Sequence, residues 1–231
     1  VITAVWWLAF SVPIWRDVHQ THYKPREEHL FKNTIAGLVG TCKKIFHDRR
    51  LMMFMLAFFF YIDGVHTIIA MSTSYGTDLG ISSTNLVLAL LVTQFVAFPS
   101  AIAYGKLAGR FGAKTMITTA VIAYICIVLF AAFFLRSATE FWILAILVGL
   151  FQGGIQALSR SYYGKIIPKN RANEYYGFYD IFGKTASIIG TFLVATTTSL
   201  TGNASVGVLS IAILLIVALI FLLLQKDPTR K

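Results

Sequence analysis

The chain has 231 residues, of which 57% are apolar and 13% are charged, and its mean hydropathy is +0.71. In soluble domains about a quarter of the residues are charged, and disordered chains have low hydrophobicity, so this composition excludes both classes and indicates a membrane protein. The net charge is +10, and the basic residues cluster in every second gap between the apolar runs. This is the positive-inside pattern of membrane proteins and not the surface of a nucleic-acid-binding protein.

The first predicted element is the apolar run of residues 1–15, VITAVWWLAFSVPIW. A signal peptide would begin with a positively charged region and end in a small-residue cleavage site, and this run has neither. We therefore interpret it as the end of a membrane span whose beginning is missing. The chain is accordingly expected to be part of a longer protein.

A polar segment follows from residue 16 to residue 50, and it contains the pattern of an amphipathic helix between Glu27 and Asp48. Five apolar side chains repeat there at steps of three and four, which places them on one helix face. They are Phe31, Ile35, Leu38, Cys42 and Ile45. Lysines lie off this stripe, so we expect a linker helix on the cytoplasmic surface near lipid headgroups, with a specific lipid or partner site as the alternative.

Histidines and cysteines give little indication of a metal site. His19, His22 and His29 lie in the same polar segment, and no cysteine stands at metal-ligand spacing beside them, so a solvated loop is the favoured interpretation. Cys42 falls in this segment and Cys126 inside an apolar stretch, which makes a disulfide between them implausible. We predict neither a metal nor a cofactor.

Six further apolar stretches run close together, each near the length that a spanning helix requires. They fall at about residues 51–76, 85–104, 115–135, 141–163, 175–198 and 205–224. None shows the alternating polar face of a barrel strand, so all six are predicted to be helices. Because basic clusters flank the set on both sides, an even number of spans is required, and the C-terminus is expected to be cytoplasmic.

Polar side chains are shared unevenly among these six stretches. The third and the sixth contain no Asp, Glu, Lys, Arg, His or Gln, so we expect these two helices at the periphery, facing lipid. An ionisable side chain in hydrocarbon is strongly unfavourable, so those in the other stretches should face a cavity or a partner. The candidate cavity or coupling residues are Asp63, His66, Gln94, Gln152, Gln156, Asp180 and Lys184, with Arg160 beside them. This distribution suggests two repeats of three helices.

Two pairs of ionisable residues each share one helix face. Asp63 lies roughly 20 Å into its helix, near mid-bilayer, and His66 follows it at i+3. Proton coupling, a structural ion pair or hydrogen-bonded helix contact, and substrate contact are the alternatives for Asp63. Asp180 and Lys184 are spaced for an intrahelical ion pair, although Lys184 could instead meet Asp63 or an anionic group of a substrate.

The fourth stretch, which contains GLFQGGIQALSRS, combines a packing motif with a polar stripe. Gly149 and Gly153 form a GxxxG step, which is typical of closely packed helices. Gln152 and Gln156 lie one turn apart, and because amides in lipid need partners or water, we interpret them as lining a cavity. Gln94 of the second stretch has a similar amide, either for the cavity or for a hydrogen bond to a neighbouring helix.

The loop after the second stretch, GKLAGRFGAK, resembles the cytoplasmic loop between the second and third helices of each half in the major facilitator superfamily. The residues that match its pattern are Gly105, Leu107, Arg110, Gly112 and Lys114. Gly109 stands where the family has Asp. We therefore expect a tight cytoplasmic turn without the charge relay that this Asp would support.

Four further blocks carry a closer resemblance, which covers essentially the whole chain. They are YIDGVHTIIAMSTSYG (61–76), QFVAFP (94–99), GLFQGGIQALSRS (149–161) and EYYGFYDIFGK (174–184). Together they resemble the C-terminal half of the vacuole-effluxer-like, or autophagy-22-like, permeases of that superfamily. The fold class implied is all-α and polytopic, with a six-helix half of a major facilitator superfamily transporter preceded by the end of one further helix.

The resemblance also implies a domain order. It places the end of transmembrane helix six at 1–15, a central cytoplasmic loop with the amphipathic helix at 16–50, the six-helix C-terminal bundle at 51–224 and a cytoplasmic tail at 225–231. In the superfamily fold, the first helix of each three-helix repeat lines the central cavity and the third faces outward. Fungal members of the family are associated with amino-acid efflux from the vacuole.

The predicted function is therefore that of half a secondary active transporter and not that of an enzyme. It would move a small polar solute, with amino acids and proton coupling as hypotheses, by alternating access. The expected partners are the solute, the lipid bilayer and the missing N-terminal half, with no nucleic acid. The expected location is the bacterial cytoplasmic membrane, or the vacuolar membrane if the protein is fungal. A non-transporting receptor or scaffold of the same fold is the alternative.

Overall fold

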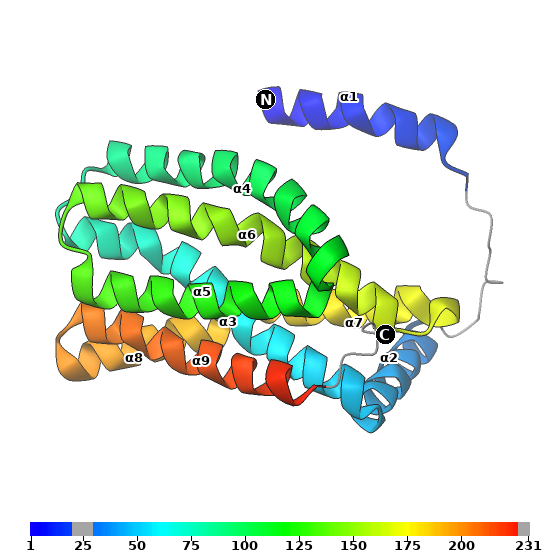
Figure 1. The fold of residues 1–231 in the computed structure, drawn as a ribbon. Coiled ribbons are helices and arrows are strands. Elements are labelled where there is room, and N and C mark those ends of the chain that lie inside the picture. Colours follow the sequence, from blue (N-terminus) through cyan, green and yellow to red (C-terminus); the bar gives the residue numbers. More distant parts are fainter. Residues whose placement is uncertain (20–29, 226–231) are drawn as a thin grey trace. The chain divides into compact units, whose positions relative to one another are not determined.

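The computed structural model describes residues 1–19 and 30–225 (Figure 1). For residues 30–36 it describes the backbone alone. Within these residues the secondary structure is helical throughout, without a strand. The chain divides into two compact units, residues 1–37 and residues 38–231. The predicted loop histidines His22 and His29 lie outside the described residues, as do the side chains of Phe31 and Ile35 on the predicted amphipathic stripe.

The first unit contains helix α1, Ile2–Asp17, and the beginning of α2, Leu30–His47. Helix α1 covers the apolar run that the sequence assigns to the end of a span. Within this unit Trp6 and Phe10 pack edge to face, with ring centroids 5.2 Å apart. The helix includes Pro13 and buries none of its side chains.

The second unit is a bundle of long apolar helices. Its elements are α3 (Arg49–Asp78), α4 (Ser83–Phe111), α5 (Ala113–Phe134), α6 (Ala138–Ile166), the short 3-10 turn η1 (Lys169–Arg171), α7 (Ala172–Thr185), α8 (Ile188–Thr201) and α9 (Ala204–Leu224). Six segments of the described chain are long and apolar enough to cross a membrane, as predicted. The fifth, Lys169–Thr201, differs from expectation because it is interrupted between α7 and α8.

Glycines allow a close helix contact in the bundle where α4 runs beside α6 (Figure 1). A Cβ atom at Gly149 would lie 2.7 Å from the carbonyl oxygen of Thr93, and one at Gly153 would lie 2.3 Å from that of Ala97. The Thr93 hydroxyl donates across the same contact to the Ala145 carbonyl, at 3.1 Å. The helix packing predicted from the GxxxG step is therefore confirmed.

We expect Gly153→Ala to lower the free energy of unfolding by about 1–3 kcal/mol, because the added methyl group would force α4 and α6 apart. The matched control is Gly177→Ala in α7, where a Cβ meets no atom within 4 Å. Alanine there should be neutral or stabilising, since glycine weakens a helix interior. Thermal unfolding of the full-length protein in detergent measures both; equal melting temperatures for the two variants would contradict the packing role.

The second half of α2 belongs to the bundle unit, and the face that it buries there overlaps the predicted stripe in part. Ile45 of the stripe is 2% exposed, as is Thr41 next to the stripe, whereas Leu38 of the stripe is exposed. The reason is polar: the Thr41 hydroxyl donates to the Glu174 carboxylate near the start of α7, at 3.1 Å. This contact turns the Thr41 side of the helix inward, and Cys42 is left half-buried.

The predicted loop motif forms a single-residue corner between α4 and α5. Gly112 joins the two helices with φ of 89°, a conformation that favours glycine. The Lys114 ammonium donates to the carbonyl of Gln225, and the Gln225 side-chain amide donates to the carbonyl of Arg50, at 3.3 Å. The turn is tight, as expected. The Lys114 hydrogen bond connects it to the end of α9, and Gln225 continues the connection to the start of α3. The guanidinium of Arg110 lies over the Phe111 ring, 5.4 Å from its centroid.

Candidate functional site

A pocket of about 300 Å³ lies between α3, α6 and α7, and we call it the charged pocket. Its walls are Phe58, Ile62 and His66 from α3, Gln156 and Arg160 from α6, and Tyr179, Asp180, Gly183 and Lys184 from α7. Four of the predicted site residues therefore meet here, although they come from three helices. Ionisable and amide groups face aromatic and aliphatic ones, so the pocket can hold a solute with both a polar and an apolar part.

An ion pair bridges α6 and α7 in this pocket. Arg160 Nη1 lies 3.0 Å from Asp180 Oδ1, and the Arg160 guanidinium also lies 4.9 Å from the centroid of the Tyr176 ring. The intrahelical pair of Asp180 with Lys184 is thus replaced by a pair between helices, because the planar guanidinium can contact the carboxylate and the ring together. Within the described residues Lys184 has no ion pair, and its side chain is exposed.

Aromatic rings hold α7 against α3 and α6 at the edge of the charged pocket. The rings of Phe58 and Tyr179 stack with centroids 4.1 Å apart, and those of Tyr163 and Tyr179 stack at 4.9 Å. The hydroxyl of Tyr61 and that of Ser159 share a hydrogen bond of 2.6 Å between α3 and α6. The sequence placed Arg160 beside the candidate residues but gave these rings no role in the site. Of the rings, Tyr179 lies in the tyrosine-rich block EYYGFYD, which was the available signal.

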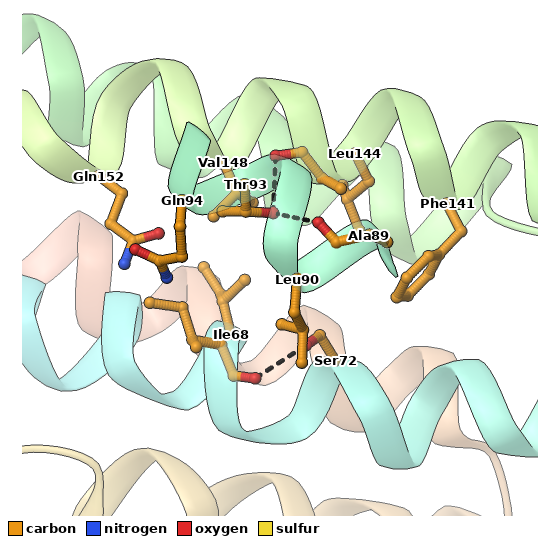
Figure 2. A pocket seen from close by; sticks show the side chains of 12 residues that line it. Ile68, Ser72, Ala89, Leu90, Thr93, Gln94, Phe141, Leu144, Val148 and Gln152 are labelled. Atoms are coloured by element: carbon orange, nitrogen blue, oxygen red, sulfur yellow. Dashed lines mark hydrogen bonds between the residues drawn. The ribbon is translucent and has the colours of Figure 1, made fainter. Parts of the chain in front are cut away.

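A smaller pocket of about 30 Å³ lies between α3, α4 and α6, and we call it the amide pocket (Figure 2). Ile68, Leu90, Leu144 and Val148 are among its apolar walls. The side chains of Gln94 and Gln152 point toward each other at one end of it (Figure 2), as expected for cavity-lining amides. This volume accommodates about one water molecule.

Gln152 is 8% exposed, and its Oε1 atom has no hydrogen-bond partner in the described structure. Gln156 lies one turn further along α6, in the charged pocket. The two glutamines, which the sequence placed on one stripe, therefore line two different pockets along the same helix. A buried amide oxygen without a partner is unfavourable, so a water or a donor group of a solute would stabilise it.

Asp63 lies outside both pockets and is fully buried. Its Oδ1 accepts from the backbone N–H of Ser187 at 2.6 Å and from that of Gly190 at 3.1 Å, and Oδ2 accepts from Gly190 at 3.2 Å. The Thr67 hydroxyl donates to Oδ1 at 3.4 Å. His66, predicted to share its face, lines the charged pocket instead. Of the alternatives for Asp63, this geometry matches the hydrogen-bonded helix contact.

Comparison with known proteins places the chain in a family. The model of the family described as "Vacuole effluxer Atg22 like" matches residues 1–228. YxiO of Bacillus subtilis, an uncharacterized MFS-type transporter, is 50% identical over 228 residues, which are 99% of this chain and 53% of that protein.

Fungal proteins match more distantly over a similar share of the chain. Autophagy-related protein 22 of Cryptococcus neoformans is 26% identical over 94% of this chain and 42% of its own length. Autophagy-related protein 22 of Saccharomyces cerevisiae is 28% identical over 88% of this chain and 45% of its own length. The chain thus spans about half the length of the curated relatives it matches.

These matches bear on three predictions from the sequence. The family predicted from the four blocks is the family found, and its description is that of a transporter and not of an enzyme. The six long apolar helices agree with an all-α polytopic membrane protein, as predicted. Both the residue blocks and the whole-length match lead to one assignment: the chain belongs to the Atg22-like vacuole effluxer family.

Proposed function

We propose that this chain forms the C-terminal half of a secondary active transporter and that its charged pocket is one wall of the solute site. The observation that carries the proposal is the exposed ammonium group of Lys184, which has no counter-ion among the described residues and faces a pocket of about 300 Å³. A charge kept in a membrane-spanning segment without a partner is typical of a solute path. Alternating access would then expose the pocket to each side of the membrane in turn.

The solute that fits this wall is a small amphiphilic molecule with an anionic group. Asp180 is neutralised by Arg160, so Lys184 is left to attract a carboxylate, while Gln156 can donate and accept hydrogen bonds. Phe58 and Ile62 give an apolar wall for the remainder of the molecule. An amino acid has this combination of groups, and the amine would be met by the other half of the protein. The description of the family as effluxers supports transport out of a compartment.

Proton coupling is a separate part of the proposal. His66 places an imidazole on the pocket wall, and imidazole is the side-chain group that most often serves as a proton carrier in proteins, so a pH gradient would act at the solute site. Asp63 is the other candidate, one turn earlier on α3. The Asp63→Asn variant keeps an oxygen acceptor and loses the titratable group, so gradient-driven transport by this variant separates coupling from a structural role.

The chain is an integral, multi-pass membrane protein. We propose the bacterial cytoplasmic membrane as its location, in line with its similarity to the Bacillus protein, and a cytoplasmic C-terminus, in line with the basic clusters. The lipid bilayer and an N-terminal half of the same protein are the proposed partners. That half would supply the second wall of the cavity.

Water access to the charged pocket tests the proposal. Starting from full-length protein in which Cys42 and Cys126 are replaced by Ser, we expect Gln156→Cys and Lys184→Cys to react with a membrane-impermeant, charged thiol reagent. The matched control is Ile213→Cys in the middle of α9, which is 56% exposed on a helix expected to face lipid and should stay unreactive. Protection of both pocket positions under transport conditions would favour the receptor or scaffold alternative.

A further inference from the structure

The fifth span is broken in its middle, although no proline lies there. Helix α7 ends at Thr185, Ala186 is extended, and α8 begins at Ile188. Between them Ser187 has φ of 87°, and it is the only non-glycine residue with positive φ in the described chain. Left-handed backbone is unfavourable for a residue with a side chain, so surrounding contacts must hold it in place.

A break inside a membrane span exposes backbone groups that a continuous helix would satisfy. The first N–H groups of α8 have no acceptor within the helix, and the Ser187 side chain does not cap them. Water is absent from the bilayer core, so each needs a partner from the protein. Asp63, from α3, accepts from two of these positions, the N–H groups of Ser187 and Gly190. It therefore caps a helix that lies more than a hundred residues later in the chain.

The fit around this cap is close. A Cβ atom at Gly190 would lie 2.1 Å from the Thr67 hydroxyl oxygen and 3.1 Å from Asp63 Oδ1, so only glycine allows α8 to approach α3 this closely. The α7 side of the break is held by different contacts, the Arg160–Asp180 pair and the Tyr179 ring stack. The two halves of the span are thus attached separately, and Asp63 attaches the α8 half.

From these contacts we infer that Asp63 is a positioning residue: it fixes the break between α7 and α8 and thereby sets where the last turn of α7, which carries Lys184, stands in the charged pocket. Both oxygens of its carboxylate are already engaged by α8. Asp63 acts through Lys184 and does not contact the solute. Only its effect on transport rests on the proposed function; the geometry of the break does not.

Spin labels on the two half-helices test this directly in the full-length, otherwise cysteine-free protein. The labels are placed at Gly177→Cys in α7 and Leu200→Cys in α8, both exposed positions. We expect a narrow distance distribution that shifts by about 5 Å, roughly one helical turn, or broadens by as much, in Asp63→Leu. Asp63→Asn should keep the original distance, because its amide oxygen still accepts from the backbone.

Controls keep the outcome interpretable. Thr67→Val removes only the longest of the hydrogen bonds to Asp63 and should leave the distance unchanged. If Asp63→Leu does not fold, Gly190→Ala serves instead, since it keeps the carboxylate but pushes α8 from α3 and should give the same shift. An unchanged distance in Asp63→Leu or Gly190→Ala, or a shift in Asp63→Asn equal to that in Asp63→Leu, would overturn the inference.

Transport by Asp63→Asn gives the second readout. The assay measures uptake of each of a panel of radiolabelled amino acids into liposomes that hold the full-length protein, with and without a pH gradient. If Asp63 is a positioning residue, Asp63→Asn should keep gradient-driven transport within about twofold of the wild type. Loss of the gradient dependence while the spin-label distance is kept would assign Asp63 to proton coupling and overturn the positioning role. Absence of transport in the wild type as well, with the distance shift observed in Asp63→Leu, would reject the proposed solutes and leave the break assignment intact.

Discussion

Replacing Lys184 with Met is expected to lower transport of a carboxylate-bearing solute by about 10- to 100-fold. A hydrogen bond to a charged group contributes about 1.5–3 kcal/mol, and each 1.4 kcal/mol is a factor of about ten in affinity. Methionine keeps the length and flexibility of the side chain but removes the ammonium group. The effect should appear mainly as a higher KM for the solute, because the lost interaction is with the bound carboxylate.

The matched control for this result is Lys165→Met, in the last turn of α6, outside the charged pocket. It removes the same charge from the protein and should leave KM unchanged. Lys184→Arg should retain part of the affinity, since a cation stays in the pocket, although its planar geometry differs. Uptake into liposomes by full-length protein is the measurement. Equal KM values for Lys184→Met and Lys165→Met would remove Lys184 from the solute site.

Loss of the Asp63 carboxylate is expected to have the largest effect on stability. In Asp63→Leu the backbone N–H groups of Ser187 and Gly190 lose their acceptor in a buried place, and each unsatisfied group costs about 1–3 kcal/mol. The total for the two groups is about 2–6 kcal/mol, which is a large fraction of the stability of most domains. Asp63→Asn should lower the free energy of unfolding by half of this amount or less, because one oxygen acceptor remains.

Thermal unfolding of the full-length protein in detergent distinguishes these two variants. The ranking expected is wild type, then Asp63→Asn, then Asp63→Leu. Asp180→Asn is the matched control, since it also removes a carboxylate from the bundle. The ion pair of Asp180 with Arg160 is partly exposed and should contribute only about 0–1 kcal/mol to the free energy of unfolding. A melting temperature for Asp63→Leu no lower than that of Asp180→Asn would show that Asp63 does not support the fold.

Local patterns were sufficient to predict most of the fold. Six apolar stretches of spanning length became six spans, because the bilayer requires length and apolarity that are visible along the chain. The GxxxG step predicted that α6 packs closely against another helix, since the absence of a side chain at Gly149 and Gly153 is itself a local property, but it did not predict that the partner is α4. The corner at Gly112 was predictable for the same reason: its positive φ favours one residue type.

The features that were not predictable depend on groups distant in the sequence. The stretch 175–198 has no proline and reads as one helix; its break becomes favourable only because Asp63 and Thr67, on another helix, can receive α8. Asp180 and Lys184 have the spacing of an intrahelical pair, yet Arg160 competes successfully from α6. In the same way, the inward face of α2 is set by Glu174 and not by the apolar stripe alone.

Two hydrogen bonds connect Lys114, Gln225 and Arg50, and they limit how far the C-terminus can be shortened. Gln225 follows the last helix, so it looks dispensable, but its backbone carbonyl receives the Lys114 ammonium and its amide reaches the Arg50 carbonyl. A truncation after Leu224 would remove both hydrogen bonds, and with them the link from the α4–α5 corner to α9 and α3. Affinity tags and fluorescent fusions should therefore begin beyond Gln225. A shortened variant for crystallisation should likewise keep Gln225, because this residue connects three helices at one membrane face.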